Sequence, residues 1–241
     1  HAVGYAMGVK FDGKVGTGNL EEDLAVISYF GDGATAEGDI SESLLFAAVN
    51  KAPIVFFIQN NQWAISSRVD TQTTVPLYTR GEGFGVPGLR IDGNDVLANY
   101  AATKYHMDQA REGAGPVLLE ALTYRIGAHT TSDDPSKYRD EEEVEYWKAR
   151  DPIQRFETFL RRQGINDDFF DEEELPSLYL KLMHRYDEMK NTTPVLVETS
   201  IPECLQYQDT EDIQVTALTQ LLLLVNKSGA SKKMLDDLVH F

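Results

Sequence analysis

The chain has 241 residues, of which 42% are hydrophobic and 25% are charged, and its formal net charge is -17 at pH 7. This length and composition allow one buried core with at most an appendage. The acidic surplus argues against nucleic acid or an anionic membrane as the main partner.

Cys204 is the single cysteine, which excludes an internal disulfide and favours a reducing compartment. The longest apolar run, residues 221–225, is far too short to span a bilayer. We therefore expect a soluble, cytoplasmic protein, or one of the mitochondrial matrix if the source is eukaryotic.

The first part of the chain predicts a helix, a strand, a second helix and a second strand. Residues 1–10 carry small side chains at every second position, for which we favour a role in close packing. The apolar run 24–30 predicts a strand that is covered on both faces. Residues 41–50 have helical spacing, and after Pro53 the run 54–58 predicts the next buried strand.

The alternation continues beyond an ordered loop at residues 66–80. Residues 89–91 and 117–124 predict a third and a fourth strand, and between them a helix extends from a cap at residues 94–95 to Arg111. The run Asp92-Gly93-Asn94-Asp95 lacks the other spaced carboxylates of a calcium loop, so we interpret it as a turn and cap. Strands alternating with helices indicate an α/β fold with a doubly wound parallel sheet.

The sequence predicts mostly helices in the last part of the chain. Helices are expected at residues 140–150 and from Pro152 to about Arg162. We expect an α/β domain over residues 1–165 and a helical C-terminal segment over residues 166–241, with helices at 176–190 and 212–225 and a short strand at 195–197. The apolar residues 221–225 favour a core or a subunit interface over a separate active module.

Polar residues follow the first two predicted strands. Gly31-Asp32-Gly33 comes after the first and Asn60-Asn61 after the second. A right-handed crossover makes these strands parallel, so both segments leave the sheet at its carboxyl edge, where open α/β sheets bind ligands. A carboxylate, an amide oxygen and backbone carbonyls hold Mg²⁺ when phosphate oxygens complete its shell. Either segment alone is more often a plain turn, but together they predict a site for a metal-bound diphosphate.

The spacing of Gly-Asp-Gly and Asn-Asn resembles the thiamine diphosphate motif. The residues Gly-Asp-Gly-Ala-Thr-Ala-Glu-Gly-Asp (31–39) and Gln-Asn-Asn-Gln-Trp-Ala-Ile-Ser (59–66) resemble the α subunit of the two-chain E1 component of 2-oxo acid dehydrogenase complexes. The resemblance implies a thiamine diphosphate-binding fold. It extends to about residue 165, and the remaining residues do not match the family's tail.

The resemblance also implies roles for individual residues. The side chains of Asp32 and Asn61 and the carbonyl of Trp63 would bind Mg²⁺. Several members carry Arg directly before Asn-Asn to hold the diphosphate, whereas Gln59 here donates hydrogen bonds without a charge. The cofactor-binding residues implied are Asp32, Gly33, Ala34, Gln59, Asn61, Ile65, Arg125 and His129.

A loop that contains a histidine leaves the fourth strand at the same edge. A lone loop histidine is more often a surface residue, but His129 can reach the diphosphate site and shuttle a proton near neutral pH. Residues 125–139 resemble the regulatory loop of the same α subunits. That likeness implies that His129 takes part in acyl transfer to lipoamide and that Arg125 orders the loop. Some relatives are phosphorylated directly after this histidine, but for Thr130 we favour ordinary loop hydrogen bonding.

The implied activity is oxidative decarboxylation of a branched-chain 2-oxo acid or pyruvate, with acyl transfer to a lipoyl-bearing E2 protein. The α chain would bind the diphosphate, while an E1 β subunit would bind the aminopyrimidine and supply the activating Glu in an α₂β₂ heterotetramer. Segments that precede the first helix in the family, and that shape the substrate pocket, are missing from this sequence. The choice of 2-oxo acid is therefore open.

Two alternatives to this activity also stay open. The first is another thiamine diphosphate enzyme, such as an acetoin dehydrogenase E1 or a transketolase-like half-protein. The second is a non-catalytic α/β module for binding or assembly.

Overall fold

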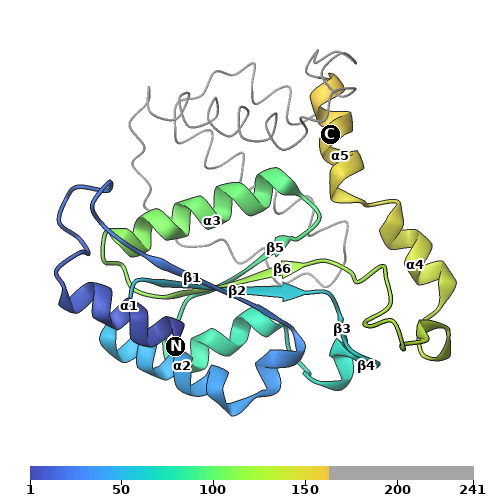
Figure 1. Cartoon of the computed structure of the whole chain (residues 1–241), viewed down its shortest axis with the longest axis horizontal. Coiled ribbons are helices and arrows are strands. Elements are labelled where there is room, and N and C mark those ends of the chain that lie inside the picture. The colour runs from blue at the N-terminus through green and yellow to red at the C-terminus, as the bar shows by residue number, and fades with distance from the viewer. Residues whose placement is uncertain (163–241) are drawn as a thin grey trace. The chain divides into compact units, whose positions relative to one another are not determined.

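The computed structural model describes residues 1–162 (Figure 1). The chain divides into two units between Asp151 and Pro152. The described part of the second unit is the helix α5 (Pro152–Arg162), which starts at the proline expected from the sequence. The helices predicted at 176–190 and 212–225 and the strand predicted at 195–197 lie outside the described residues, and the domain boundary near residue 165 stays a prediction.

Four parallel strands form the main sheet of the first unit. They are β1 (Val26–Gly31), β2 (Ile54–Asn60), β5 (Gly88–Asp92) and β6 (Val117–Leu122). Their order in the sheet is β1-β2-β6-β5, and every pairing is parallel. The prediction of a parallel α/β sheet is confirmed. Because β6 lies between β2 and β5, the ends of β1, β2 and β6 are neighbours at the carboxyl edge.

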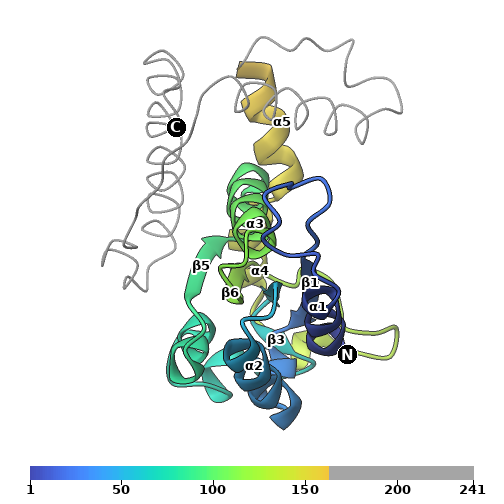
Figure 2. The same ribbon diagram turned by 90° about the vertical axis from the view of Figure 1, so that its left-hand side faces the viewer.

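Helices lie on both faces of this sheet. The helices α1 (Ala2–Phe11) and α2 (Gly38–Asn50) lie on one face, and α3 (Val96–Arg111) lies on the other (Figures 1 and 2). The larger core lies between the sheet and the first two helices, where Ala6 and Leu44 pack with the β2 residues Ile54, Phe56 and Ile58. None of the described helices has the length and the apolar character needed to cross a membrane.

The expectation for the small residues of α1 is partly wrong. Ala6 is fully buried in the core, as close packing requires. A Cβ added at Gly4 or Gly8, however, would meet no atom within 4 Å. The reason is the helical repeat, because only residues three or four apart share a face and Val3, Ala6 and Val9 occupy the buried one.

Several short elements escaped prediction. The strands β3 (Trp63–Ala64) and β4 (Ser67–Arg68) form an antiparallel hairpin directly after β2. The 3₁₀ helices η1 (Gly33–Ala36) and η3 (Leu77–Phe84) follow β1 and precede β5. The segment expected as loop, residues 66–80, therefore contains β4 and the start of η3. β3, β4 and η1 have two to four residues and are too short for a periodic pattern to show, whereas η3 has eight residues and was simply missed.

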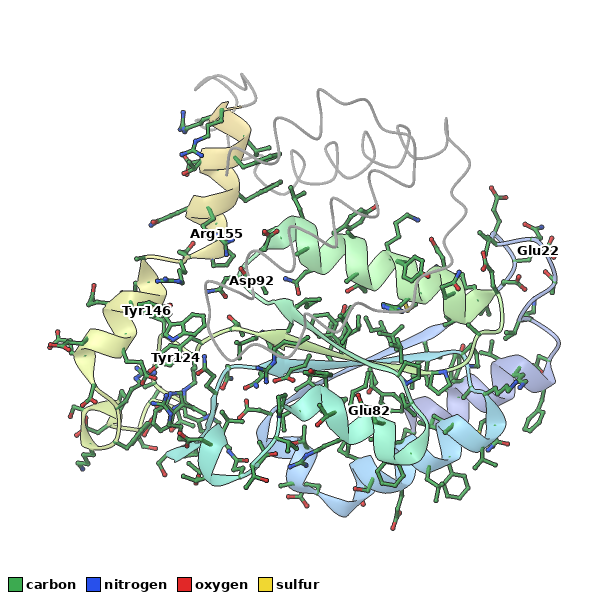
Figure 3. All side chains as sticks on the ribbon, turned by 180° about the vertical axis from the view of Figure 1, so that it is seen from behind. Glu22, Glu82, Asp92, Tyr124, Tyr146 and Arg155 are labelled. Carbon is green, nitrogen blue, oxygen red and sulfur yellow. The ribbon has the colours of Figure 1, made fainter. Side chains whose placement is uncertain are left out.

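The cap of α3 is as predicted. The side chain of Asp95 accepts a hydrogen bond from the backbone N–H of Ala98 (2.9 Å). Asp92, at the end of β5 (Figure 3), accepts from the backbone N–H of Asn94 (2.8 Å), which forms the turn. Asp92 to Asp95 is thus a turn and a helix cap.

A small aromatic cluster attaches α4 (Glu141–Lys148) to the hairpin. Trp63, Tyr124 and Trp147 are its buried members. The rings of Tyr124, labelled in Figure 3, and Trp147 stack with centroids 5.5 Å apart, and the Tyr124 hydroxyl donates to Glu143 (2.8 Å). Burial, followed by the hydrogen bond to Glu143, raises the pKa of Tyr124 to about 12. The neutral hydroxyl is therefore the form that holds this contact.

Candidate diphosphate and metal site

The Asp32 and Asn61 segments meet at the carboxyl edge of the sheet. Gly31, the last residue of β1, is the Cα partner of Gln59 in β2, so the next residues of both strands emerge side by side. Burial raises the pKa of Asp32, and the backbone N–H groups of Asp32 and Asn61 and the charge of Arg125 oppose this increase. Asn61 therefore lies close enough to stabilise the Asp32 carboxylate, as parallel pairing requires.

Asp32 is a buried carboxyl with an unused oxygen. Its residue is 2% exposed, and among the described residues Oδ2 has no hydrogen-bond partner. A buried carboxylate is unfavourable unless a cation or donors compensate it. This oxygen therefore fits a metal ligand.

The turn after β1 packs tightly against the hairpin. A Cβ added at Gly33 would lie 2.7 Å from the Cβ of Ala64, so no larger residue fits there without movement. Thr35 donates its hydroxyl to the carbonyl of Asp32 (2.6 Å), and the guanidinium of Arg80 donates to the carbonyl of Thr35. Ala34, half-buried, lies between these contacts in the chain. The turn that follows the carboxylate is thus held from two sides.

The turn after β2 has an unusual backbone at Gln62, where φ is +70°. The amide oxygen of Asn61 accepts a hydrogen bond from the backbone N–H of Trp63 (3.1 Å). The carbonyl of Asn61 accepts from the backbone N–H of Arg125 (3.2 Å). An amide oxygen has two lone pairs, so Asn61 keeps one for a cation.

Arg125 holds the hairpin at the site through backbone carbonyls. Its guanidinium donates to the carbonyl of Trp63 (3.2 Å) and to the carbonyl of Ile65 (2.6 Å). The Trp63 carbonyl, the predicted metal ligand, is therefore shared with an arginine but keeps a second lone pair. Ile65 is 56% exposed and has φ of +55°, which is rare for a β-branched residue and which the sequence did not signal.

Gln59 and Arg125, the two other residues predicted to bind the diphosphate, differ in charge and in position. Gln59 is exposed at the end of β2, next to Gly31, and carries no charge. Arg125, which follows β6, is the cation whose charge acts on Asp32. The positive charge near Asp32 thus comes from the loop that follows β6, on the other side of β2 from β1.

His129 is joined to this site through other residues of its loop. Its backbone N–H donates to Asp133 (2.8 Å), and the hydroxyl of Tyr138 donates to the same carboxylate oxygen (2.5 Å). Arg125 donates to the Tyr138 hydroxyl (2.9 Å). The hydrogen bonds from Tyr138 and then His129 lower the pKa of Asp133. His129 itself is exposed, so the structure brings its loop, but not its own side chain, into contact with the hairpin.

Glu120 and its contact with Asn60 were not identified from the sequence. Asn60 is the last residue of β2 and Glu120 lies inside β6; both are buried, and the Asn60 amide donates to the Glu120 carboxylate (2.7 Å). Glu120 interrupts the apolar run Val117–Leu122, and a charged residue in such a run was the sequence signal that could have indicated a buried polar contact.

The donor set suits a hard cation that also binds phosphate. In residues 1–162 no group of three or more His, Cys, Asp and Glu side chains converges. A cation at Asp32 would therefore complete its shell with amide, carbonyl and phosphate oxygens, which is the pattern of Mg²⁺ bound with a diphosphate.

Comparison with known proteins gives a consistent family. Residues 1–195 match the family described as dehydrogenase E1 component. The chain is 51% identical over 166 residues to the 3-methyl-2-oxobutanoate dehydrogenase subunit alpha of Mycobacterium tuberculosis, which covers 68% of this chain and 43% of that relative. It is 53% identical over 146 residues to the pyruvate dehydrogenase E1 component subunit alpha of Acholeplasma laidlawii, covering 60% of this chain and 41% of the relative.

A longer match exists to a plant protein. The mitochondrial 2-oxoisovalerate dehydrogenase subunit alpha 2 of Arabidopsis thaliana is 37% identical over 231 residues, which is 95% of this chain and 46% of that protein. The likeness therefore continues past residue 165, and the expectation that it stops there is wrong. The chain spans less than half the length of these curated relatives.

Proposed function

This chain belongs to the dehydrogenase E1 component family, and from that premise we propose that it is the diphosphate-binding part of an E1 α subunit. In this proposal it binds thiamine diphosphate with Mg²⁺ for the oxidative decarboxylation of a 2-oxo acid. The observation that carries the proposal is the buried, unpaired oxygen of Asp32 beside the Asn61 turn. The sheet is then the doubly wound thiamine diphosphate fold.

Each site residue has one role in the proposal. The carboxylate of Asp32, the amide oxygen of Asn61 and the carbonyl of Trp63 hold Mg²⁺. Arg125 balances the negative charge of the diphosphate, and Gln59 donates to it. Gly33, Ala34 and Ile65 line the cofactor. When bound, thiamine diphosphate supplies the nucleophilic carbon and the electron sink of the reaction, while the protein supplies position and electrostatics.

The substrate follows from the names of the relatives. These are 3-methyl-2-oxobutanoate, 2-oxoisovalerate and pyruvate dehydrogenase subunits, so the proposed substrate is a branched-chain 2-oxo acid or pyruvate. His129 assists acyl transfer to lipoamide, and its place on an exposed loop suits contact with a lipoyl group on a second protein.

The proposed partners are an E1 β subunit, in an α₂β₂ heterotetramer, and a lipoyl-bearing E2 protein, all in the cytoplasm or the mitochondrial matrix. A surface feature of α2 supports a subunit partner. Leu45, Phe46 and Val49 are 48%, 58% and 74% exposed, and apolar surfaces of this kind mark protein interfaces.

Calorimetry of thiamine diphosphate with and without Mg²⁺ tests the proposal. We expect metal-dependent binding by the full chain, with a β subunit present, and its loss in Asp32→Ala. Asp23→Ala is the matched control, because Asp23 is also 2% exposed but precedes β1, at the opposite edge of the sheet. Absence of binding by the parent chain even with a β subunit would contradict the proposal and favour a non-catalytic module.

A further inference from the structure

A fully buried carboxylate lies directly below the proposed metal site. Glu120, in the middle of β6, is the Cα partner of Ile58 in β2 and of Arg90 in β5. Its residue has no exposed surface. A charge in such a position is strongly unfavourable unless it is well compensated, so its presence calls for an explanation.

Three donors compensate the Glu120 carboxylate. Oε1 accepts from the guanidinium of Arg90 (2.7 Å) and from the side-chain amide of Asn60 (2.7 Å). Oε2 accepts from the backbone N–H of Tyr78 in η3 (2.9 Å). All three partners are donors, which suits the ionised carboxylate, and they come from three different elements.

Of these three contacts, the one with Asn60 connects Glu120 to the proposed metal site. With its Nδ2 held by Glu120, the Asn60 side chain has its Oδ1 turned to the backbone N–H of Gln62 (3.0 Å). That contact closes the turn in which Gln62 has positive φ. The conformation of this turn sets the positions of the Asn61 amide oxygen and the Trp63 carbonyl, which are two of the three proposed metal ligands.

The fixed orientation of the Asn60 amide is the essential point. A free asparagine side chain can exchange its oxygen and nitrogen by rotation, and either atom could then face Gln62. Glu120 accepts hydrogen bonds only, so it selects the orientation in which the amide oxygen faces the turn.

We propose that Glu120 is a positioning residue, which holds Asn60 and thereby the Asn61–Trp63 turn in the geometry that binds Mg²⁺. This inference rests on the proposed function of the same site. Glu120 touches neither the metal nor the diphosphate in this scheme, and acts through Asn60. Outer residues that orient metal ligands in this way change metal affinity strongly when they are replaced.

Glu120→Gln in the full chain tests the proposal by two measurements. The amide has the size of the carboxylate but presents a donor to partners that are all donors. We expect faster hydrogen exchange at the backbone amides of Gln62 and Trp63. With a β subunit present, we also expect the Mg²⁺ concentration needed for half-maximal thiamine diphosphate binding to rise about 10- to 100-fold. At saturating Mg²⁺ the cofactor affinity should return close to that of the parent.

A matched control separates positioning from general loss of stability. Asp23 is also a buried carboxylate, and it accepts two hydrogen bonds from the backbone N–H of Thr17 (3.1 Å each) at the other edge of the sheet. We expect Asp23→Asn to lower the melting temperature but to leave the exchange at the turn and the Mg²⁺ requirement unchanged.

A second variant protects the test against misfolding. Asn60→Ala removes the link to the turn and leaves Glu120 with Arg90 and Tyr78, so it should produce both changes by itself. Unchanged exchange and unchanged Mg²⁺ dependence in a folded variant would overturn the proposal. If the parent binds no thiamine diphosphate, the proposed function fails, while the exchange measurement still decides whether Glu120 orients the turn.

Discussion

At the scale of single residues, the burial of Asp32 lowers the stability of the chain when no ligand is bound. Its carboxylate is buried at the edge of the sheet and leaves one oxygen without a partner among the described residues. In the empty chain such an arrangement destabilises the fold, because the unfolded chain hydrates the same group fully. Ile65 adds to this with a positive φ that β-branched residues avoid. Unfavourable local features of this kind concentrate where a ligand binds.

We predict that Asp32→Asn makes the empty chain more stable at pH 7. Since burial raises the pKa of Asp32 in the folded state, the unfolded chain releases this proton first as the pH rises. The free energy of unfolding therefore decreases as the pH rises from 3.8, the ordinary pKa of the group, to the raised pKa in the folded state. Above that pH the loss of stability stays constant. Removing the charge should raise the free energy of unfolding by about 1 kcal/mol, the lower end of the cost of an unpaired buried polar group.

Thermal melts of parent and variant between pH 4 and 7 measure this effect. The advantage of Asp32→Asn should shrink as the pH falls toward 3.8, where the parent carboxyl is also neutral. With thiamine diphosphate and Mg²⁺ added, the order should reverse, because only the parent gains binding free energy. A variant less stable than the parent at every pH would show that Asp32 already has its full set of partners.

At the scale of elements, the loop after β6 is tied to the hairpin by one arginine. Arg125 bonds the carbonyls of Trp63 and Ile65 on one side and the Tyr138 hydroxyl on the other. Arg139 adds a hydrogen bond to the carbonyl of Ile126 (2.8 Å). Together these contacts order a segment that has little apolar surface of its own.

We predict that Tyr138→Phe loosens this loop without disturbing the hairpin. The variant loses the hydrogen bonds to Asp133 and Arg125 but keeps the ring against Trp63, whose centroid is 5.3 Å away. Faster hydrogen exchange over residues 126–137 is expected, with a loss of about 1 kcal/mol in the free energy of unfolding. Tyr29→Phe, at a 65% exposed position in β1, is the control. Equal hydrogen exchange of residues 126–137 in both variants would show that the Tyr138 hydroxyl does not order the loop.

At the scale of the whole molecule, the first unit supplies one side of the proposed site. In the proposal, this chain binds the diphosphate of the cofactor and Mg²⁺, and the β subunit binds the aminopyrimidine. The exposed apolar residues of α2 and the exposed loop that carries His129 give the unit two outward surfaces, one suited to a subunit and one to a lipoyl group.

We predict that His129→Ala, in an assembled enzyme, slows acyl transfer to lipoamide by about 100-fold or more, the usual contribution of a positioned acid or base. The affinity for thiamine diphosphate should stay near that of the parent, because the contacts of His129 are with Asp133 and not with the ligands of the metal. Single-turnover transfer to a lipoyl domain and calorimetry measure the two quantities.

Thr130→Ala is the matched control for this experiment, since the side chain of Thr130 hydrogen-bonds to the Ser132 hydroxyl (3.2 Å) and the substitution leaves the Thr130 carbonyl, which accepts from the backbone N–H of Asp133, in place. We expect it to transfer acyl groups at the parent rate. Equal transfer rates in the parent and in His129→Ala would exclude His129 from the mechanism.

The sequence by itself determined the parallel sheet and the meeting of Asp32 with Asn61. Short apolar runs separated by segments with helical spacing specify parallel strands, and the right-handed crossover then brings their carboxyl ends to one edge. It also determined the turn and cap at Asp92 and Asp95, because side-chain capping is local in the chain.

Only the tertiary structure decided the finer parts of the site. The hairpin at Trp63, the positive φ of Ile65 and the open space beside Gly4 and Gly8 depend on what does or does not pack there from elsewhere in the chain. The pairing of Glu120 with Asn60 joins residues that are 60 positions apart, through a strand order that places β6 beside β2. Local pattern cannot reveal such contacts, because their energy arises from burial and from partners that the fold alone brings together.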